Sequence, residues 1–377
     1  MRVLVAPDKF RGTLTATEAG HAIRRGWLRT RPRDSVEAVP MADGGEGTLE
    51  ALVSALKGEV AGATVSGPLG DPVTAQYGVV ATSEGTTAVI EMARASGLEL
   101  VAESRRDPVR ASTRGTGELI RYAIERHRPS SVLVCIGGSA TTDGGAGMAQ
   151  ALGARLLDER GTEIGPGGGA LLDLRLIDLD GLVPRIGSVR FVVASDVDNP
   201  LVGPGGAAAV YGPQKGADPD DVLLLDRALG HYAAILNRDL GVDVRDAPGA
   251  GAAGGLGAGL IAFTGARLRA GIDVVMEAVG LHGRLERADL VITGEGQFDE
   301  QSLHGKTVAG VIRAAEDERV GVLVLCGRAE VRPEGLRVAS LVERFGEQEA
   351  LENTRLCLES LAQEVAATMP LGSSPRA

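Results

Sequence analysis

The chain has 377 residues and a net charge of −11, and 54 of its residues are glycine, about twice the usual share of ~7%. A chain of this length is expected to form two domains, each with a core large enough to fold without disulfides. The acidic balance, and the lack of a basic stripe interleaved with aromatic residues, argue against nucleic acid as a partner.

The sequence shows no sign of a membrane segment or of secretion. It opens directly on an apolar strand (2–6), and its longest uncharged stretch, 247–266, is too rich in glycine for a membrane span. The three cysteines, Cys135, Cys326 and Cys357, form no CxxC pair, which is typical of a reducing compartment. We therefore expect a cytoplasmic protein without a membrane partner. The sequence leaves open whether it forms a homodimer.

Both ends of the chain alternate between strands and helices. At the N-terminus the pattern predicts strands over 2–6 and 36–40 and helices over 16–28 and 48–58, the first capped by Thr15 or Thr17. At the C-terminus it predicts strands over 288–296, 320–327 and 338–343, helices over 306–318 and 351–368, and a short helical piece over 333–337. Two early and three late strands, separated by helices, indicate one parallel, doubly wound sheet of five strands.

The middle of the chain has a different pattern, which indicates an inserted domain. Residues 64–91 resemble antiparallel hairpin strands. Further strands are predicted over 132–138 and 190–196, and helices over 115–127, 144–154 and 218–240. We therefore expect an α/β protein with a discontinuous parallel domain (1–60 and 286–377) and an inserted, mixed α/β domain (61–285).

Five segments share one pattern, in which an apolar strand or helix meets a turn of glycine with Asp, Glu, Ser or Thr. They are 7–16, 41–48, 135–145, 194–207 and 293–307. In parallel α/β sheets, ligands bind at the carboxyl ends of the strands. Several of these turns are therefore expected to meet in one cleft between the two domains.

The turns at 44–47 and 137–145 have the chemistry of an anion site. Glycine lets backbone N–H groups approach a phosphate or carboxylate closely, and a helix that begins after the turn adds its positive end. The hydroxyls of Ser139, Thr141 and Thr142 add further donors. The alternative for 137–145 is a tight turn with a Ser or Thr helix cap.

Acids follow two of the predicted strands. Asp196, Asp198 and Asn199 end one strand, and Glu295 and Asp299 follow another. Mg²⁺ prefers one or two carboxylates and leaves room for phosphate oxygens, and a kinase uses an Asp to orient the attacking hydroxyl. The alternative for each acid taken alone is a helix cap or a solvated carboxylate.

Lysine is scarce, since only four of the 39 basic residues are lysines. Three of the four, Lys9, Lys215 and Lys306, lie beside glycine-rich turns. Codon bias accounts for most of the shortage. A lysine that is retained beside a turn indicates a compact point charge within reach of a ligand.

Known nucleotide motifs are absent or weak. The run 300–307 ends like a Walker A motif but has Glu300 where the first glycine belongs. GAGAAG (249–254) fits the dinucleotide pattern GxGxxG, but the residues before it make a poor strand. Besides a kinase, two alternatives remain: an NAD-dependent oxidoreductase acting on a small hydroxy acid, and a non-catalytic binding protein for an organic acid.

Taken together, the glycine-rich segments resemble the bacterial glycerate kinases of the first type, which phosphorylate D-glycerate. The matching segments cover nearly the whole chain, in order: APDKFRGTLTATEA (6–19), PMADGGEGT (40–48), GPLGDPV (67–73), IEMARASGL (90–98), STRGTGELI (112–120), IGGSATTDGGAGMAQALGA (136–154), SDVDNPLVGPGGAAAVYGPQKGA (195–217), PGAGAAGGLGAGL (248–260) and ADLVITGEGQFDEQSLHGKT (288–307). One departure is DKFRG (8–12), where many relatives have DSFKG; the cation is kept as Arg11 and Lys9 is added.

The resemblance implies a flavodoxin-like, discontinuous domain with a second α/β domain inserted into it. It also implies ATP with Mg²⁺ and glycerate as ligands, and 2-phosphoglycerate as the product. On this basis the candidate catalytic residues are Asp196, Lys9 and Arg11. The candidates for ATP phosphates are Gly44, Gly45, Gly47, Gly137, Gly138, Ser139, Thr141, Thr142 and Lys306. The candidates for the substrate are Asp43, Asp198, Asn199 and Glu295, and those for the metal are Asp198 and Asp299.

Overall fold

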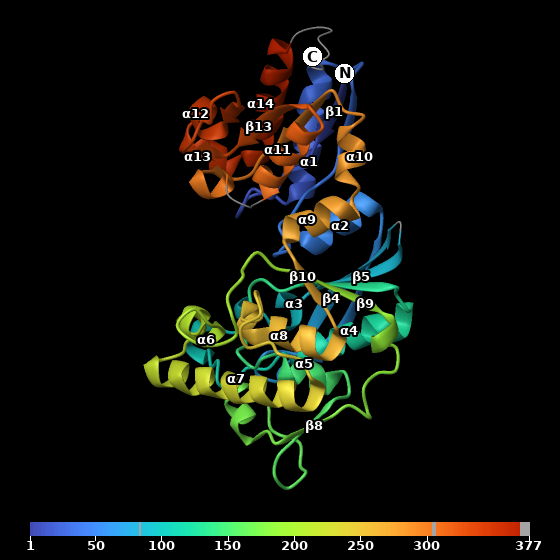
Figure 1. The fold of residues 1–377 in the computed structure, drawn as a ribbon. Helices are drawn as coiled ribbons and strands as arrows, with labels where there is room; N and C mark the ends of the chain where they lie inside the picture. Colours follow the sequence, from blue (N-terminus) through green and yellow to red (C-terminus); the bar gives the residue numbers. More distant parts are fainter. Residues whose placement is uncertain (83, 304–306, 370–377) are drawn as a thin grey trace. The chain divides into compact units, whose positions relative to one another are not determined.

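The computed structural model describes residues 1–82, 84–303 and 307–369. Internal contacts divide the chain into two compact units (Figure 1). Unit 1 comprises Met1–Asp43, Glu50–Gly58 and Ile272–Ala377, and unit 2 comprises Gly44–Leu49 and Glu59–Gly271.

Unit 1 contains a five-stranded parallel sheet with the strand order β15-β13-β11-β1-β2. The strands are β1 (Arg2–Val5), β2 (Ser35–Ala38), β11 (Leu290–Thr293), β13 (Gly321–Cys326) and β15 (Arg337–Ser340). Taken from the β2 edge, the order in the chain is 2-1-3-4-5, which is the flavodoxin-like arrangement. The predicted doubly wound sheet is therefore confirmed, and its topological switch point lies between β1 and β11.

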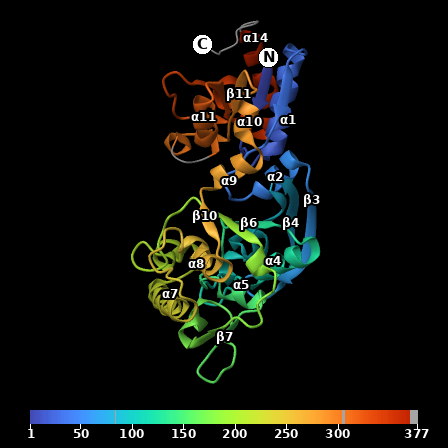
Figure 2. The same ribbon diagram turned by 45° about the vertical axis from the view of Figure 1, so that its right-hand side comes forward.

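Helices cover both faces of this sheet. The first, α1 (Ala16–Thr30), lies beside α14 (Thr354–Thr368) on one face, where both pack on apolar side chains of the strands (Figures 1 and 2). On the other face, α11 (Thr307–Asp317) packs on the remaining alternate residues, such as Val324. Helix α1 begins at Thr15, whose hydroxyl accepts from Glu18 N–H while the Glu18 carboxylate accepts from Thr15 N–H. This capping box is the start that the sequence predicted.

The remaining elements of unit 1 are short. They are α2 (Thr48–Leu56, which begins in unit 2), α9 (Gly271–Ala278), α10 (Leu281–Leu285), β12 (Gln297–Phe298), a 3₁₀ turn (Glu300–Leu303), β14 (Arg328–Ala329), α12 (Leu341–Phe345) and α13 (Glu347–Glu352). The helical piece predicted over 333–337 was wrong, because Gly335 has a φ of +80° and forms a turn. The last predicted strand is shorter than expected, because Ser340 caps α12.

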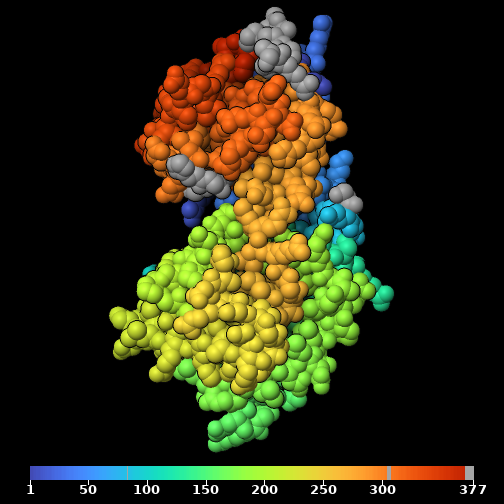
Figure 3. All heavy atoms as spheres, viewed as in Figure 1, coloured from blue at the N-terminus to red at the C-terminus, as the bar shows by residue number. Residues whose placement is uncertain are grey.

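The observed division of the chain differs from the expected boundaries in two places. Residues 272–285 belong to unit 1, where Ile272 packs against Gly310 of α11 and Arg284 pairs with Glu37 of β2. In the space-filling view this orange segment is continuous with the rest of the C-terminal part of unit 1 (Figure 3). The short stretch Gly44–Leu49 belongs to unit 2, because it packs on the ends of that unit's strands.

Unit 2 contains a six-stranded mixed sheet with the order β10-β9-β6-β5-β4-β3. The antiparallel part is β3 (Glu59–Ser66), β4 (Pro72–Thr82) and β5 (Gly85–Glu91), which confirms the predicted hairpins. The parallel part adds β6 (Ser131–Cys135), β9 (Arg190–Ala194) and β10 (Arg267–Arg269). A small separate sheet pairs β7 (Arg155–Leu157) with β8 (Leu176–Asp178).

The helices of unit 2 are α3 (Ala93–Ser96), α4 (Arg114–His127), α5 (Ala146–Ala151), α6 (Ala207–Tyr211), α7 (Pro219–Leu240) and α8 (Ala252–Thr264). Helix α7, which appears in yellow, covers part of the surface of this unit (Figure 3). Its N-terminus has a capping box of Asp218 with Asp221. Among the described residues, no helix is both long enough and apolar enough to cross a membrane.

Candidate functional site

In unit 1, the loops that follow β1 and β11 meet at the switch point of the sheet. The N–H of Asp8 donates to the carbonyl of Gly294 at 2.8 Å. Gly296 lies so close to the other loop that a Cβ atom there would be 3.1 Å from the backbone nitrogen of Arg11. The predicted turn 7–16 thus lies beside the first part of the predicted turn 293–307, at the place where open α/β sheets bind ligands.

Asp8 is the most perturbed acid of this group, and sequence reasoning did not single it out. Burial and, to a smaller extent, the nearby charge of Asp43 raise the pKa of Asp8 to about 6. Thr307, and the N–H of Lys9 that donates to Asp8 Oδ1 at 2.6 Å, oppose this shift. A half-buried carboxyl that titrates near neutral pH at a ligand-binding edge is a functional candidate.

The predicted residues of unit 1 are distributed around these loops. Lys9, Arg11 and Asp43 lie on the β1 and β2 sides, and Glu295 lies on the β11 side. Asp299 acts as a cap, since its Oδ1 accepts from the N–H and the hydroxyl of Ser302 at 3.0 and 3.3 Å. Lys306 lies outside the described residues.

In unit 2, the glycine turn 44–47 packs on the carboxyl ends of the parallel strands. A Cβ atom on Gly44 would be 2.7 Å from the Cβ of Ala194 at the end of β9. A Cβ atom on Gly137, after β6, would be 3.4 Å from the Cα of Gly45. The structure therefore brings together two of the predicted glycine turns, and glycine is required at Gly44, where the φ of +85° and the close approach both exclude a side chain.

Glu91, at the end of β5, binds the first turn of α2, directly after the glycine turn 44–47. Its Oε1 accepts from the N–H of Leu49 at 2.9 Å and its Oε2 accepts from Arg94 Nε at 2.7 Å. The carboxylate is buried. One of the backbone donors in the first turn of α2 is therefore satisfied by the protein itself.

The helix after the loop 136–145 does not offer its N-terminus to an anion, contrary to the prediction. Helix α5 begins only at Ala146, and the N–H groups of Gly145 and Gly147 donate to Asp143 at 3.1 and 3.2 Å. The next N–H, of Met148, donates to the hydroxyl of Thr113 at 2.9 Å. These donors are occupied, so an anion would have to be bound by the exposed backbone of Gly137 and Gly138.

Two of the predicted hydroxyl donors, those of Thr141 and Thr142, are not exposed on the loop. The side chains of Thr141 and Thr142 are fully buried, and their hydroxyls have no hydrogen-bond partner among the described residues. Neither hydroxyl is exposed on the surface of the loop, so their predicted role with phosphate stays a prediction. Ser139 is also buried, at 7% exposure, but it directly follows the exposed glycine pair.

Lys215 reaches the same loop from a 3₁₀ turn (Pro213–Lys215). Its Nζ donates to Ser139 Oγ at 2.8 Å and to the carbonyl of Thr141 at 2.6 Å. Burial lowers the pKa of Lys215 to about 7, although the charge of Asp143 raises it. Burial also raises the pKa of Asp143, against the hydrogen bonds that it accepts.

The acids after β9 have unequal surroundings. Asp196 is exposed, and its Oδ1 accepts from the N–H of Gly271 at 2.9 Å. Asp198 is exposed near Tyr211, whose pKa rises through burial and through the charge of Asp198. Asn199 holds its own loop, because its amide donates to Gly205 at 2.8 Å and accepts from the Tyr211 hydroxyl at 2.6 Å.

The dinucleotide alternative loses its support. Within the described residues no strand precedes GAGAAG (249–254), which opens on a turn. A Cβ atom on Gly251 would lie 2.1 Å from the carbonyl of Pro200, and one on Gly254 would lie 1.9 Å from that of Thr141. These glycines serve the close packing of α8 on the loops after β6 and β9.

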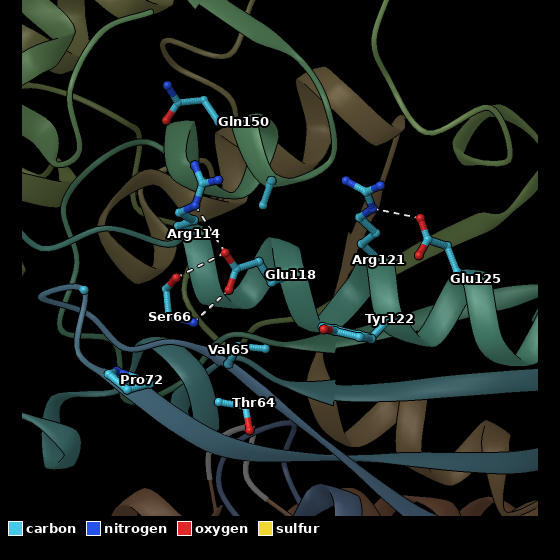
Figure 4. Close-up of a pocket in the computed structure, with 12 residues that line it drawn as sticks. Thr64, Val65, Ser66, Pro72, Arg114, Glu118, Arg121, Tyr122, Glu125 and Gln150 are labelled. Carbon is cyan, nitrogen blue, oxygen red and sulfur yellow. Dashed lines mark hydrogen bonds and ion pairs between the residues drawn. The ribbon is translucent and has the colours of Figure 1, made fainter.

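A separate pocket of about 580 Å³ lies on unit 2 beside β3 and α4 (Figure 4). Its charged groups pair with one another: Glu118 accepts from Arg114 Nε at 3.2 Å, and Glu125 accepts from Arg121 Nε at 2.7 Å. The Glu118 carboxylate also accepts from the N–H of Ser66 at 2.7 Å. This pocket lacks the glycine turns, and we do not assign the site to it.

Comparison with known proteins identifies the family of the chain. The model of the glycerate kinase family matches residues 3–370. A glycerate kinase of Bacillus subtilis (strain 168) is 46% identical over 99% of both chains, and a glycerate 2-kinase of Escherichia coli (strain K12) is 49% identical over 87% of this chain and 85% of its own. A crystal structure from Salmonella typhimurium LT2, of a protein provisionally named glycerate kinase 2, superposes with a TM-score of 0.90 at 46% identity over 98% of both chains. The chain therefore belongs to the glycerate kinase family, whose reaction is the transfer of a phosphoryl group from ATP to glycerate.

Proposed function

We propose that the chain transfers the γ-phosphoryl group of ATP to the hydroxyl on C2 of D-glycerate and releases 2-phosphoglycerate. The choice of the C2 hydroxyl is supported by the Escherichia coli relative, which carries the name glycerate 2-kinase. The observation that carries the proposal is the contact between the glycine turns 44–47 and 137–138 at the ends of adjacent parallel strands. Such turns suit the phosphate groups of a nucleotide.

In this proposal the backbone amides of unit 2 bind the phosphates, and unit 1 supplies positively charged side chains. The backbone of Gly44, Gly45 and Gly47, and that of Gly137 and Gly138, would donate to phosphate oxygens together with Ser139. Lys9 or Arg11 would neutralise the transferred phosphoryl group or bind the carboxylate of glycerate, and Lys306 would add a further cation. Phosphoryl transfer depends mainly on positioning and on charge neutralisation, so this set of groups suits the reaction.

Asp196 is the proposed base, or the group that orients the hydroxyl. It is exposed at the end of β9, and the N–H of Gly271 fixes its carboxylate. We further propose that Asp43, Asp198, Asn199 and Glu295 contact the substrate. For Asn199 this role would be indirect, because its amide already closes the loop 199–205.

We propose Mg²⁺ as the metal, bound by Asp198 or Asp299 together with phosphate oxygens. Among the described residues no group of three or more His, Cys, Asp or Glu side chains could hold a metal alone. Mg²⁺ sites in kinases need only one or two carboxylates, so single acids fit this ion. Both hydrogen bonds to Asp299 end on Oδ1. When bound, Mg²⁺ neutralises phosphate charge.

We propose a cytoplasmic location because the three cysteines are all buried and form no disulfide among the described residues. The proposed ligands are small molecules only, in keeping with the net charge of −11.

The test is an assay of ADP release with ATP and D-glycerate, in which the product is then offered to enolase alone. We expect release that depends on glycerate and direct conversion of the product by enolase, which accepts 2-phosphoglycerate. A product that enolase converts only after a phosphoglycerate mutase is added would overturn the C2 assignment. Oxidation of NADH with hydroxypyruvate would favour the oxidoreductase, and binding of glycerate without turnover would favour the binding protein.

The role of Asp196 is tested in the same assay with Asp196→Asn. We expect kcat to fall by about 10²-fold or more, which is the usual effect of removing a general base. Wild-type kcat in this variant would overturn the assignment.

A further inference from the structure

We propose that Lys215 is a positioning residue for phosphoryl transfer, because its buried ammonium group holds the loop 136–143 in the shape that binds phosphate. This inference rests on the proposed function, since that function gives the loop its ligand. Lys215 itself is 1% exposed and contacts the underside of the loop.

One ammonium group holds the loop at two points. Its Nζ donates to the side chain of Ser139 at 2.8 Å and to the main chain of Thr141 at 2.6 Å. The two acceptors lie on either side of Ala140, so the bend between them is fixed. The exposed glycine pair comes directly before this bend. Displacement of the bend would therefore move the amides that the proposed function assigns to phosphate.

The turn that carries Lys215 is also held firmly. Gly216, with a φ of +98°, lies so close to Arg106 that a Cβ atom would be 3.2 Å from the Arg106 carbonyl. The guanidinium of Arg106 donates to the carbonyl of Gln214 at 3.3 Å. These contacts fix the backbone of Lys215. Its ammonium group can therefore hold Ser139 and Thr141 at a fixed position.

Folding stability does not explain a lysine at this position. Its ammonium makes no ion pair within the described part of the chain, and the carboxylate that acts on it from a distance, Asp143, accepts its hydrogen bonds from Thr113, Gly145 and Gly147. Burial lowers the pKa of Lys215 to about 7, which shows that the fold disfavours the charge. Even a buried ion pair can often be replaced by apolar groups of similar size without loss of stability, so a buried charge is weak evidence for a role in folding. A function of the loop accounts for the charge.

The expected consequence concerns ATP more than glycerate. A preorganised set of donors binds a phosphate without rearrangement, and loosening it weakens binding and lowers the rate. We expect the loosened loop to raise the KM for ATP on the order of tenfold, which corresponds to about 1.4 kcal/mol of binding free energy.

The experiment compares Lys215→Met with Lys57→Met, the latter at an exposed lysine at the end of α2. We expect Lys215→Met to melt at the wild-type temperature or above it, with a KM for ATP raised about tenfold and a KM for glycerate changed much less. Lys57→Met should match the wild type in all three measurements. Lys215 is merely structural if its variant melts at a lower temperature and the loss of activity follows the loss of folded protein.

A second variant decides the matter if Lys215→Met does not fold. Arg106→Met removes the hydrogen bond to the carbonyl of Gln214 and so loosens the turn that carries Lys215, while Ser139 and the other groups proposed for phosphate stay in place. We expect a smaller rise in the KM for ATP, and an unchanged KM would overturn the positioning role. The two proposals fail differently: a wild type without glycerate-dependent ADP release overturns the function, whereas an active wild type with an unaffected Lys215→Met overturns only the role of Lys215.

Discussion

The loops at the carboxyl ends of the strands are built differently in the two units. In unit 1 the loops after β1 and β11 meet through main-chain contacts, and Asp8 lies between them as a half-buried acid. In unit 2 the loops are held by buried charged side chains: Glu91, Asp143 and Lys215. The meeting of the loops in unit 1 follows from the topology of its sheet. The loops in unit 2 depend on side-chain contacts between residues far apart in the sequence.

The largest expected effect comes from removing Asp143. Its carboxylate accepts four hydrogen bonds, two of them from Thr113. Asp143→Ala would leave these donors buried without partners, so we expect unit 2 to lose more than about 4 kcal/mol of stability. Hydrogen–deuterium exchange of peptides from β6 and α5 measures the loss in unit 2 directly.

The matched control is Asp71→Asn, at an exposed aspartate that pairs with the exposed Arg105. A surface pair of this kind contributes at most about 1 kcal/mol. If the two variants exchanged at the same rate, the loops of unit 2 would not depend on the buried charge, and the contrast between the units would disappear.

The sequence was sufficient for the architecture of unit 1. Five apolar strands separated by helices allow few arrangements, and the parallel, doubly wound sheet was found as predicted. The boundary near residue 285 was wrong because α9 and α10 carry no signal of which core they join. Their assignment depends on single contacts, such as Ile272 on Gly310, that no local pattern reveals.

The sequence was less informative about the site. Glycine turns identified the loops, but a turn does not show which of its donors the protein itself uses. Asp143 was part of a predicted phosphate turn, yet it takes the amides of Gly145 and Gly147 for itself. The scarcity of lysine did draw attention to Lys215. Its contacts with Ser139 and Thr141 span more than seventy residues, and no spacing rule predicts them.

Two glycines separate close packing from backbone conformation in unit 2. Gly254 and Gly265 have similar φ values, +68° and +65°, but a Cβ atom would clash only at Gly254, 1.9 Å from the carbonyl of Thr141. We expect Gly265→Ala to cost about 1 kcal/mol, for conformation alone, and Gly254→Ala to cost more than about 3 kcal/mol. Thermal denaturation followed by circular dichroism compares the two. Equal losses would show that α8 does not depend on close contact with the loop after β6.

In unit 1 the expected change has the opposite sign. The pKa of Asp8 is about 6 in the folded protein against an ordinary 3.8, so the folded state holds the proton more tightly than the unfolded state does. The proton on Asp8 therefore stabilises the folded state. This contribution to the free energy of unfolding is present in full below about pH 4 and is lost as the pH rises through about 6. We expect Asp8→Asn to exceed the wild type in stability above pH 6 by up to about 3 kcal/mol, and to match it near pH 4.

The fluorescence of Trp27, the single tryptophan of the sequence, reports on unit 1 and suits this measurement. Urea titrations at pH 4, 6 and 8 give the difference between variant and wild type at each pH. A difference that does not change with pH would mean that Asp8 does not titrate in this range.

The smallest expected effect concerns the pocket beside α4, where both partners of the pair Arg121–Glu125 are about half exposed. An exposed pair with this helical spacing contributes about 0.3–0.5 kcal/mol, so Glu125→Gln should barely change stability. The pocket is a surface depression between paired side chains, and it shares no residue with the glycine turns. We therefore expect unchanged KM values for ATP and glycerate in the ADP-release assay. A raised KM for either ligand would mean that a ligand of the reaction binds at this surface. The assignment of ATP and glycerate to the glycine turns and to the loops of unit 1 would then be wrong.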